Sequence, residues 1–114
     1  MTLPGRVVVL STDLMDRSRF DPLRGLGTDV AVVRRAADVA AALAAVDGDG
    51  RVVLVVDLSR PDAIEAIGVG TGAVVDVVAY GSHVDREDLD RARAVGARVY
   101  ARSAFFSRLV DAVQ

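Results

Sequence analysis

One segment of the sequence constrains the fold more than any other, because five consecutive apolar residues end abruptly on a carboxylate. The segment runs from Arg51 through residues 52–56 to Asp57. A short, continuous apolar run predicts a strand that is buried on both faces, as in a parallel sheet. In open α/β sheets, ligands bind outside the carboxyl ends of the strands. Asp57 is therefore expected at the edge of the sheet where binding or chemistry takes place.

The rest of the chain alternates short apolar runs with segments of helical composition. The predicted strands cover residues 6–10, 29–33, 52–57, 73–80 and 98–101, and the predicted helices cover residues 14–23, 36–46 and 59–67, a segment capped by Asp85 and a segment that starts near Ser103. This alternation predicts a parallel sheet with right-handed crossovers. The expected fold is α/β and flavodoxin-like, a doubly wound five-stranded parallel sheet with helices on both faces. The length is typical of one domain, so residues 1–114 are expected to form a single unit.

The composition suits this fold and excludes several kinds of site. Hydrophobic residues make up 52% of the chain and aromatic residues only 4%, as expected for a sheet of Val and Leu covered by Ala-rich helices. The chain has no Cys and one histidine, His83, which excludes disulfides, cysteine-bound zinc and a multi-histidine metal centre. All 14 basic residues are Arg, which excludes lysine Schiff bases. Because no base has a recognisable spacing from a nucleophile, we predict no enzyme activity. We also expect no cofactor and no metal site.

Charge and hydropathy restrict the expected partners. The formal net charge is −2, and Arg34–Arg35 and the nearby Arg91 and Arg93 form pairs rather than an extended patch. Nucleic-acid binding is not expected, because neutralising phosphates requires a clustered excess of positive charge. No apolar run approaches the roughly 20 residues that span a bilayer, and residues 1–10 do not resemble a signal peptide. The expected location is the cytoplasm, without membrane contact.

A glycine-rich stretch, Gly68–Gly72, lies between the third predicted helix and the fourth predicted strand. A glycine-rich loop cradles phosphate when it opens a helix and presents aligned N–H groups. This stretch instead follows a helix and leads into a strand. It is interpreted as a flexible connector, with nucleotide binding as the alternative.

Two points along the chain carry a family resemblance. Asp57 ends the third predicted strand, and Gly96 and Ala97 lead into the fifth, Arg98–Ala101. Together with the spacing of strands, helices and loops over nearly the whole chain, they resemble the receiver domain of two-component response regulators. The resemblance implies the flavodoxin-like fold, a role in two-component signalling, and that Asp57 occupies the family's phosphoacceptor position.

The chain departs from this family after its first predicted strand. Receiver domains carry two acidic residues there that hold a magnesium ion, whereas this chain has Ser11 and Thr12, with Asp13 one position later. A hard divalent cation needs several oxygen ligands, so this replacement weakens the expected metal site.

Further departures follow the fourth and fifth predicted strands. The family's Ser or Thr aligns with Tyr80 or Gly81, which leaves Ser82 as a displaced candidate, and its Lys aligns with Ser103. Arg102 is adjacent, but strand alternation directs its side chain to the opposite face unless the backbone bends.

The segment Tyr80–His83 is expected at the same edge as Asp57. Its histidine has two interpretations, a plain loop or capping role, or a modest binding site formed together with Asp13, Asp57 and Arg102. Asp57 also has a structural interpretation, because a carboxylate there can accept backbone N–H bonds from the start of the following helix.

These departures favour a pseudo-receiver, a non-catalytic protein-interaction module that has kept the receiver scaffold and lost phosphorylation-dependent switching. The resemblance points to the face formed by the helix after Asp85, the strand at 98–101 and the last helix, where a protein partner or a second copy would bind. We expect Phe106 on the core stripe of the last helix and Phe105 half-exposed, as an interface anchor.

Two alternatives remain. The first is a small-molecule binding domain that takes a phosphate-bearing or acidic ligand at the carboxyl ends of the strands, with Arg102 and the N-terminus of the helix predicted at 59–67 as the positive elements. The second is an atypical response regulator that is phosphorylated on Asp57 and uses Asp13 as a metal ligand.

Overall fold

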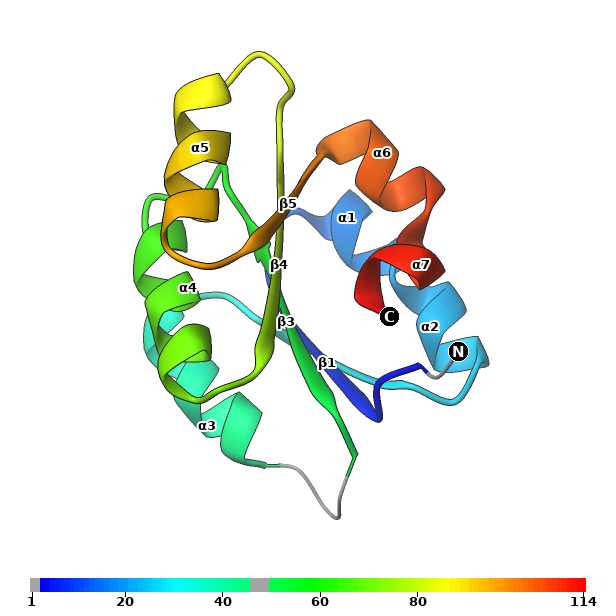
Figure 1. Ribbon diagram of the computed structural model, residues 1–114. Helices are drawn as coiled ribbons and strands as arrows, with labels where there is room; N and C mark the ends of the chain where they lie inside the picture. The colour runs from blue at the N-terminus through cyan, green and yellow to red at the C-terminus, as the bar shows by residue number, and fades with distance from the viewer. Residues whose placement is uncertain (1–2, 46–49) are drawn as a thin grey trace.

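The computed structural model describes residues 3–45 and 50–114. Five parallel strands form one sheet in the order β2-β1-β3-β4-β5 (Figure 1). The strands are β1 (Arg6–Leu10), β2 (Asp29–Val33), β3 (Val52–Asp57), β4 (Asp76–Gly81) and β5 (Arg98–Ala101). This strand order, 2-1-3-4-5, is one of the common orders of doubly wound parallel sheets. The predicted flavodoxin-like fold is confirmed.

The helices cover both faces of this sheet. They are α1 (Leu14–Ser18), α2 (Asp21–Gly25), the 3-10 turn η1 (Ala36–Asp38), α3 (Val39–Ala44), α4 (Ala63–Gly72), α5 (Arg86–Ala94), α6 (Arg102–Ser107) and α7 (Leu109–Val113). Helices α3, α4 and α5 lie on one face, and α1, α2, α6 and α7 lie on the other (Figure 1). None of the helices in the described ranges combines the length and hydropathy that a bilayer span requires.

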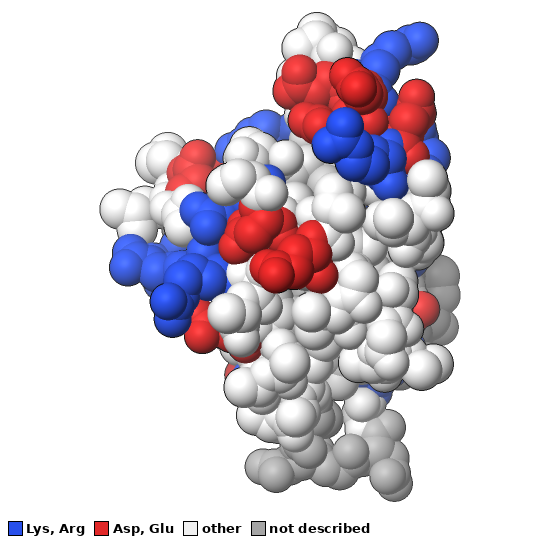
Figure 2. Space-filling model, turned by 90° about the vertical axis from the view of Figure 1, so that its left-hand side faces the viewer, with Lys and Arg blue, Asp and Glu red and all other residues white. Residues whose placement is uncertain are grey.

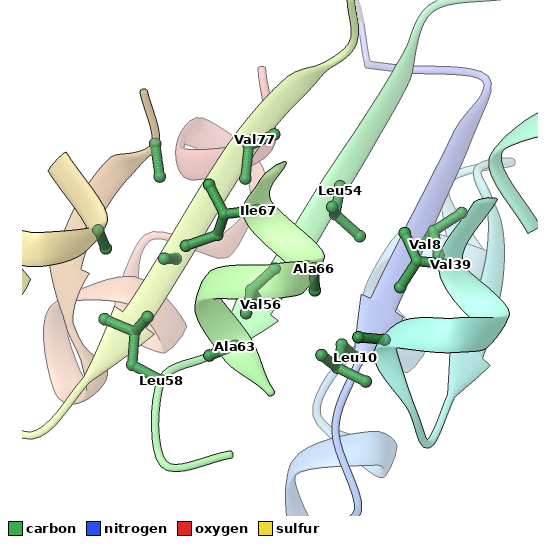
Figure 3. Close-up of a cluster of buried hydrophobic side chains, with 14 of the residues drawn as sticks. Val8, Leu10, Val39, Leu54, Val56, Leu58, Ala63, Ala66, Ile67 and Val77 are labelled. Atoms are coloured by element: carbon green, nitrogen blue, oxygen red, sulfur yellow. The ribbon is translucent and has the colours of Figure 1, made fainter. Parts of the chain in front are cut away.

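The continuous apolar strands are explained by burial on both sides of the sheet. Leu54 and Val56 of β3 pack with Ile67 of α4 on the α3–α5 face (Figure 3). Val53 and Val55 belong to the core cluster on the opposite face, with the α6 and α7 side chains. Successive strand residues point to opposite faces, so a strand covered on both sides is apolar throughout.

Helix α4 overturns the interpretation of Gly68–Gly72 as a connector, since it continues through Gly72. Gly70 faces the sheet, and a Cβ atom there would lie 2.7 Å from Val77 Cγ2 and 2.8 Å from Leu54 Cδ2. The glycine lets the helix approach the sheet closely. The stretch is therefore neither a loop nor a phosphate cradle, and β4 begins at Asp76 rather than at residue 73.

Other helix boundaries also differ from the prediction. The segments 14–23, 36–46 and the last helix each divide into two short elements, with breaks before Asp21, at Val39 and at Arg108. Residues 59–62 form a turn, so α4 begins only at Ala63. The predicted carboxyl end of the 36–46 segment, Val46, lies outside the described residues.

Candidate functional site

Buried polar side chains collect at the carboxyl edge of the sheet. Ser11 follows β1, Asp57 ends β3, and Asp16 approaches from α1. All three are buried. The one other buried polar residue in the described part of the chain is Thr28, which precedes β2. Tyr80 of β4 is in register with Asp57 and is fully buried. This edge is the candidate site.

Asp57 is only 5% exposed. Its Oδ1 accepts hydrogen bonds from the Ser59 backbone N–H at 2.9 Å and from the Ser59 hydroxyl at 2.8 Å. These bonds resemble the expected capping role, but they hold the turn before α4 rather than the helix itself, which starts at Ala63. No arginine or histidine nitrogen lies within 4.0 Å of the Asp57 carboxylate in the described ranges.

An ion pair between Asp16 and Arg102 dominates the electrostatics beside Asp57. Arg102 Nη1 donates to Asp16 Oδ2 at 2.6 Å, and Arg102 Nη2 donates to Asp16 Oδ1. The Asp16 side chain is completely buried, whereas the Arg102 side chain is 39% exposed. Two parallel bonds of this kind fix the guanidinium in one plane. The hydrogen bonds to Asp16 raise the pKa of Arg102, which stays charged.

Tyr80 of β4 is also hydrogen-bonded to Asp16. Its hydroxyl donates to Asp16 Oδ2 at 3.2 Å, and its ring stacks on Phe105 with centroids 4.9 Å apart. Burial raises the pKa of Tyr80 strongly, and the negative charges of Asp57 and Asp16 raise it further. The phenol is therefore a neutral hydrogen-bond donor.

Arg102 reaches this side of the sheet because the backbone changes conformation at the end of β5. Ala101 is extended, with φ −63° and ψ 144°, and α6 begins at Arg102. The strand alternation that would direct the side chain to the opposite face thus stops one residue earlier. Arg102 lines the same cavity as Asp57.

This cavity, called the Asp57 cavity below, has a volume of about 140 Å³. Its charged lining consists of Asp57, Asp85, Asp88 and Arg102, and Leu58 and Leu89 supply apolar walls. Three acidic residues thus line the cavity together with one arginine that Asp16 already binds. Nevertheless, no three acidic or histidine side chains of the described residues converge closely enough to ligate one metal ion.

The residues predicted after the first strand have separate roles. Ser11 Oγ accepts from the Asp13 backbone N–H at 3.2 Å. Thr12 is exposed, and its Oγ1 accepts from Arg60 at 3.3 Å. Asp13 caps α1, because its Oδ1 accepts from the Met15 N–H at 2.8 Å, and its Oδ2 lies 4.0 Å from Arg102. Asp13 therefore acts as a helix cap at the margin of the site.

The other candidates are only partly brought together. Ser82 lines the Asp57 cavity, and its Oγ accepts from the Val84 N–H at 3.4 Å. His83 instead lines a separate cavity beside α5 together with Arg86 and Arg93. Ser103 is exposed on α6 and does not line the Asp57 cavity.

The expectation for Phe105 as a half-exposed interface anchor is wrong. Phe105 is fully buried and contacts Tyr80, Tyr100 and Phe20, whereas Phe106 is half-buried. The helix begins at Arg102 and breaks at Arg108, which turns the helix so that residue 105 faces the sheet. Phe106 lies beneath Arg19, whose guanidinium carbon is 4.2 Å from the ring centroid.

Sequence reasoning missed Asp16. The residue follows the cap Asp13 in the first turn of α1, where an acidic side chain ordinarily faces solvent and complements the helix dipole. Here Asp16 faces inward while Leu14 and Met15 are 71% and 75% exposed. This inverted pattern gives no local signal, since its cause is Arg102, 86 residues further on.

Comparison with solved structures identifies the fold. The receiver domain of the response regulator TorR, of the TMAO respiratory system, superposes with a TM-score of 0.75 and 15% identity, covering 97% of this chain and all of that chain. The Vibrio cholerae chemotaxis protein CheY4 gives a TM-score of 0.74 and 15% identity, with 97% and 99% of the two chains covered.

A third similar structure is a complex. The receiver domain of the Saccharomyces cerevisiae response regulator Ssk1, crystallised with the histidine phosphotransfer protein Ypd1, gives a TM-score of 0.71 and 14% identity over 96% of this chain and 89% of that chain. No protein-family model matches the sequence, and no curated protein matches it. At these identities the likeness is one of fold, and the chain has the fold of response-regulator receiver domains.

Proposed function

We propose that this chain is a receiver-like signalling domain that binds a protein partner without depending on phosphorylation of Asp57. The observation that carries the proposal is the Asp16–Arg102 pair. Arg102, whose side chain lines the same cavity as Asp57, is already bound through two bonds to a buried carboxylate. Phosphoryl transfer depends on positioning and on neutralising charge at the acceptor. Because Asp16 holds the Arg102 guanidinium, this cation contributes little to positioning a phosphoryl group at Asp57 or to neutralising its charge.

The neighbours of Asp57 support the same proposal. Ser11 and Thr12 follow β1 at the positions where receiver domains carry their magnesium-binding acids, and Asp13 is engaged as a helix cap. The Asp57 Oδ1 atom holds two bonds from Ser59 that stabilise the β3–α4 turn. In this proposal Asp57 is a structural carboxylate, and the domain has one constitutive surface state.

The proposed partner is a protein, by analogy with the Ssk1 receiver domain that binds Ypd1. The surface that we propose is formed by α5, β5 and α6. Strand β5 is an edge strand, and Tyr100 on it is half-buried. A cavity of about 360 Å³ beside it is lined by His83, Arg86, Asp90 and Arg93 among others. Charged side chains gather over α5 (Figure 2). A second copy of the chain is one partner that this surface would accept.

The charge of the Asp57 cavity opposes the acidic-ligand alternative. Asp57, Asp85 and Asp88 all line the cavity, and among the described residues Arg102 is the one cation that lines it. A phosphate or carboxylate ligand would approach three carboxylates, and like charges at such distances repel.

Intact-mass analysis after incubation with acetyl phosphate and magnesium tests the proposal. The expected result is an unchanged mass, because Asp57 lacks the charge neutralisation that a phosphoacceptor needs. Asp57→Asn is the matched control, since asparagine keeps an Oδ1 acceptor for Ser59. A single phosphate adduct that is absent from the Asp57→Asn variant would reject the proposal and restore the phosphoacceptor alternative.

A surface test addresses the partner. Sedimentation velocity of the wild type and of an Arg93→Glu variant measures self-association through the α5–β5–α6 face. If a second copy binds there, the variant shifts toward monomer, whereas Arg34→Glu, on the exposed loop after β2, leaves the distribution unchanged. Equal distributions for all three proteins would exclude the homodimer on this face.

A further inference from the structure

We infer that the Asp57 cavity binds an organic cation, the guanidinium or ammonium group of an arginine or lysine that a partner protein inserts. The inference rests on the proposed function, because it specifies the chemistry of the partner segment. The charge of this ligand is opposite to that of the phosphate-bearing or acidic ligand that the sequence offered as an alternative. Three features of the cavity support this inference: its charge balance, the free carboxylate oxygen of Asp57, and its size and walls.

Charge balance is the first argument. Asp16 and Asp57 are both at least 95% buried at this edge, but Arg102 binds only Asp16, and no arginine or histidine nitrogen of the described residues lies within 4.0 Å of the Asp57 carboxylate. The two terminal nitrogens of Arg102 are committed to Asp16. A buried carboxylate without a cation is costly, so Asp57 favours an additional positive charge. Asp85 and Asp88 add negative charge around the same cavity.

The geometry of Asp57 is the second argument. Ser59 donates both of its hydrogen bonds to Oδ1, and Oδ2 receives no hydrogen bond from any described group. The side chain lines the cavity and is 5% exposed. A donor that enters the cavity would therefore meet a carboxylate oxygen with free lone pairs, held in place through its other oxygen. Charge-assisted bonds to such an oxygen are the strong ones.

The size and walls of the cavity decide between kinds of cation. A volume of about 140 Å³ suits one side-chain head group, and is well below the ~300 Å³ at which pockets for whole small molecules begin. Leu58 and Leu89 line it and would contact the methylene groups of an arginine or lysine. A divalent metal ion requires several converging oxygens, and the described residues hold no such group of three.

The test is a titration with N-acetyl-arginine amide, followed through the amide chemical shifts of Ser59 and Gly81. The matched probe is N-acetyl-citrulline amide, which has nearly the same shape and no charge. We expect saturable shifts with the arginine probe, and binding that is about tenfold weaker or more for the citrulline probe and for Asp57→Asn, because a charge-assisted bond is lost. Asp90→Asn is the control variant, since Asp90 lies on α5 but outside the Asp57 cavity.

Several outcomes would overturn the inference. They are equal binding of the two probes, unchanged binding to Asp57→Asn, absence of saturable shifts up to the solubility limit, and displacement of the arginine probe by magnesium ions at equimolar concentration. The last outcome would assign the site to a metal ion. The inference fails separately from the proposed function, because a protein that takes neither the arginine probe nor phosphate still fits a phosphorylation-independent module.

Discussion

The Asp16 carboxylate lies completely buried beneath the Arg102 guanidinium, and the two groups connect α1 to α6 through two hydrogen bonds. The exposures are unequal, since Arg102 remains 39% exposed. Removing either partner therefore has different consequences. Without Arg102, a buried charge is left behind, whereas without the Asp16 charge, Arg102 can turn toward water.

We predict that Arg102→Ala lowers the free energy of unfolding by about 2–3 kcal/mol, below the 3–5 kcal/mol of fully buried pairs because the guanidinium is partly exposed. Asp16→Asn should cost less, because asparagine still accepts from Tyr80 and leaves no buried charge. Urea denaturation of both variants measures the difference, with Arg34→Ala as a surface control. A larger loss for Asp16→Asn than for Arg102→Ala would contradict this account.

A second prediction concerns Tyr80 at alkaline pH. Burial and the nearby carboxylates raise its folded-state pKa above the ordinary value of 10.0. The contribution of this group to stability is fully present below pH 10.0 and is lost as the pH rises toward the folded-state pKa, because the unfolded state ionises first. In a Tyr100→Phe variant, where Tyr80 is the remaining tyrosine, tyrosinate absorbance should appear together with the loss of circular dichroism at alkaline pH.

The matching stability measurement uses Tyr80→Phe. This variant removes the hydroxyl that donates to Asp16, and we expect it to cost about 1 kcal/mol at neutral pH. It should also flatten the alkaline decline in stability. Tyrosinate that forms in the Tyr100→Phe variant while the protein is still folded would show that the phenol is less protected than its burial implies.

The strands were predictable and the site was not, for a physical reason. Continuous apolar runs place β1 and β3 correctly, because a strand that is buried on both faces of a sheet is apolar at consecutive residues. Asp57 is also at the predicted edge. The partner of Asp16 lies 86 residues away, so no local pattern marks it. Phe105 and Phe106 are neighbours, and a helix start shifted by one residue exchanges which of them faces the sheet.

A third prediction compares these two phenylalanines. Phe105 is fully buried, with its ring stacked on Tyr80, so Phe105→Ala should lower the free energy of unfolding by about 3–5 kcal/mol. Phe106→Ala should cost clearly less, because Phe106 is half-buried against Arg19. Thermal denaturation of the two variants gives the order directly. The opposite order would return Phe105 to the surface and with it the original interface hypothesis.

The glycines of α4 provide the last prediction, because one helix holds a test position and its own control. Gly68 is exposed, and a Cβ atom there would meet nothing within 4 Å. Gly70 faces the sheet, where a Cβ atom would come within 2.7 Å of Val77 and 2.8 Å of Leu54. Both residues carry the same conformational cost of glycine in a helix, but only Gly70 is required by packing.

We therefore expect opposite signs for the same substitution two residues apart. Gly68→Ala should raise the free energy of unfolding by about 0.5–1 kcal/mol, through helix propensity alone. Gly70→Ala should lower it by about 1–3 kcal/mol, because α4 must move away from β3 and β4 to admit the methyl group. Urea denaturation of both variants measures these two changes in the free energy of unfolding. Stabilisation by both substitutions would mean that α4 does not approach the sheet as closely as Gly70 allows.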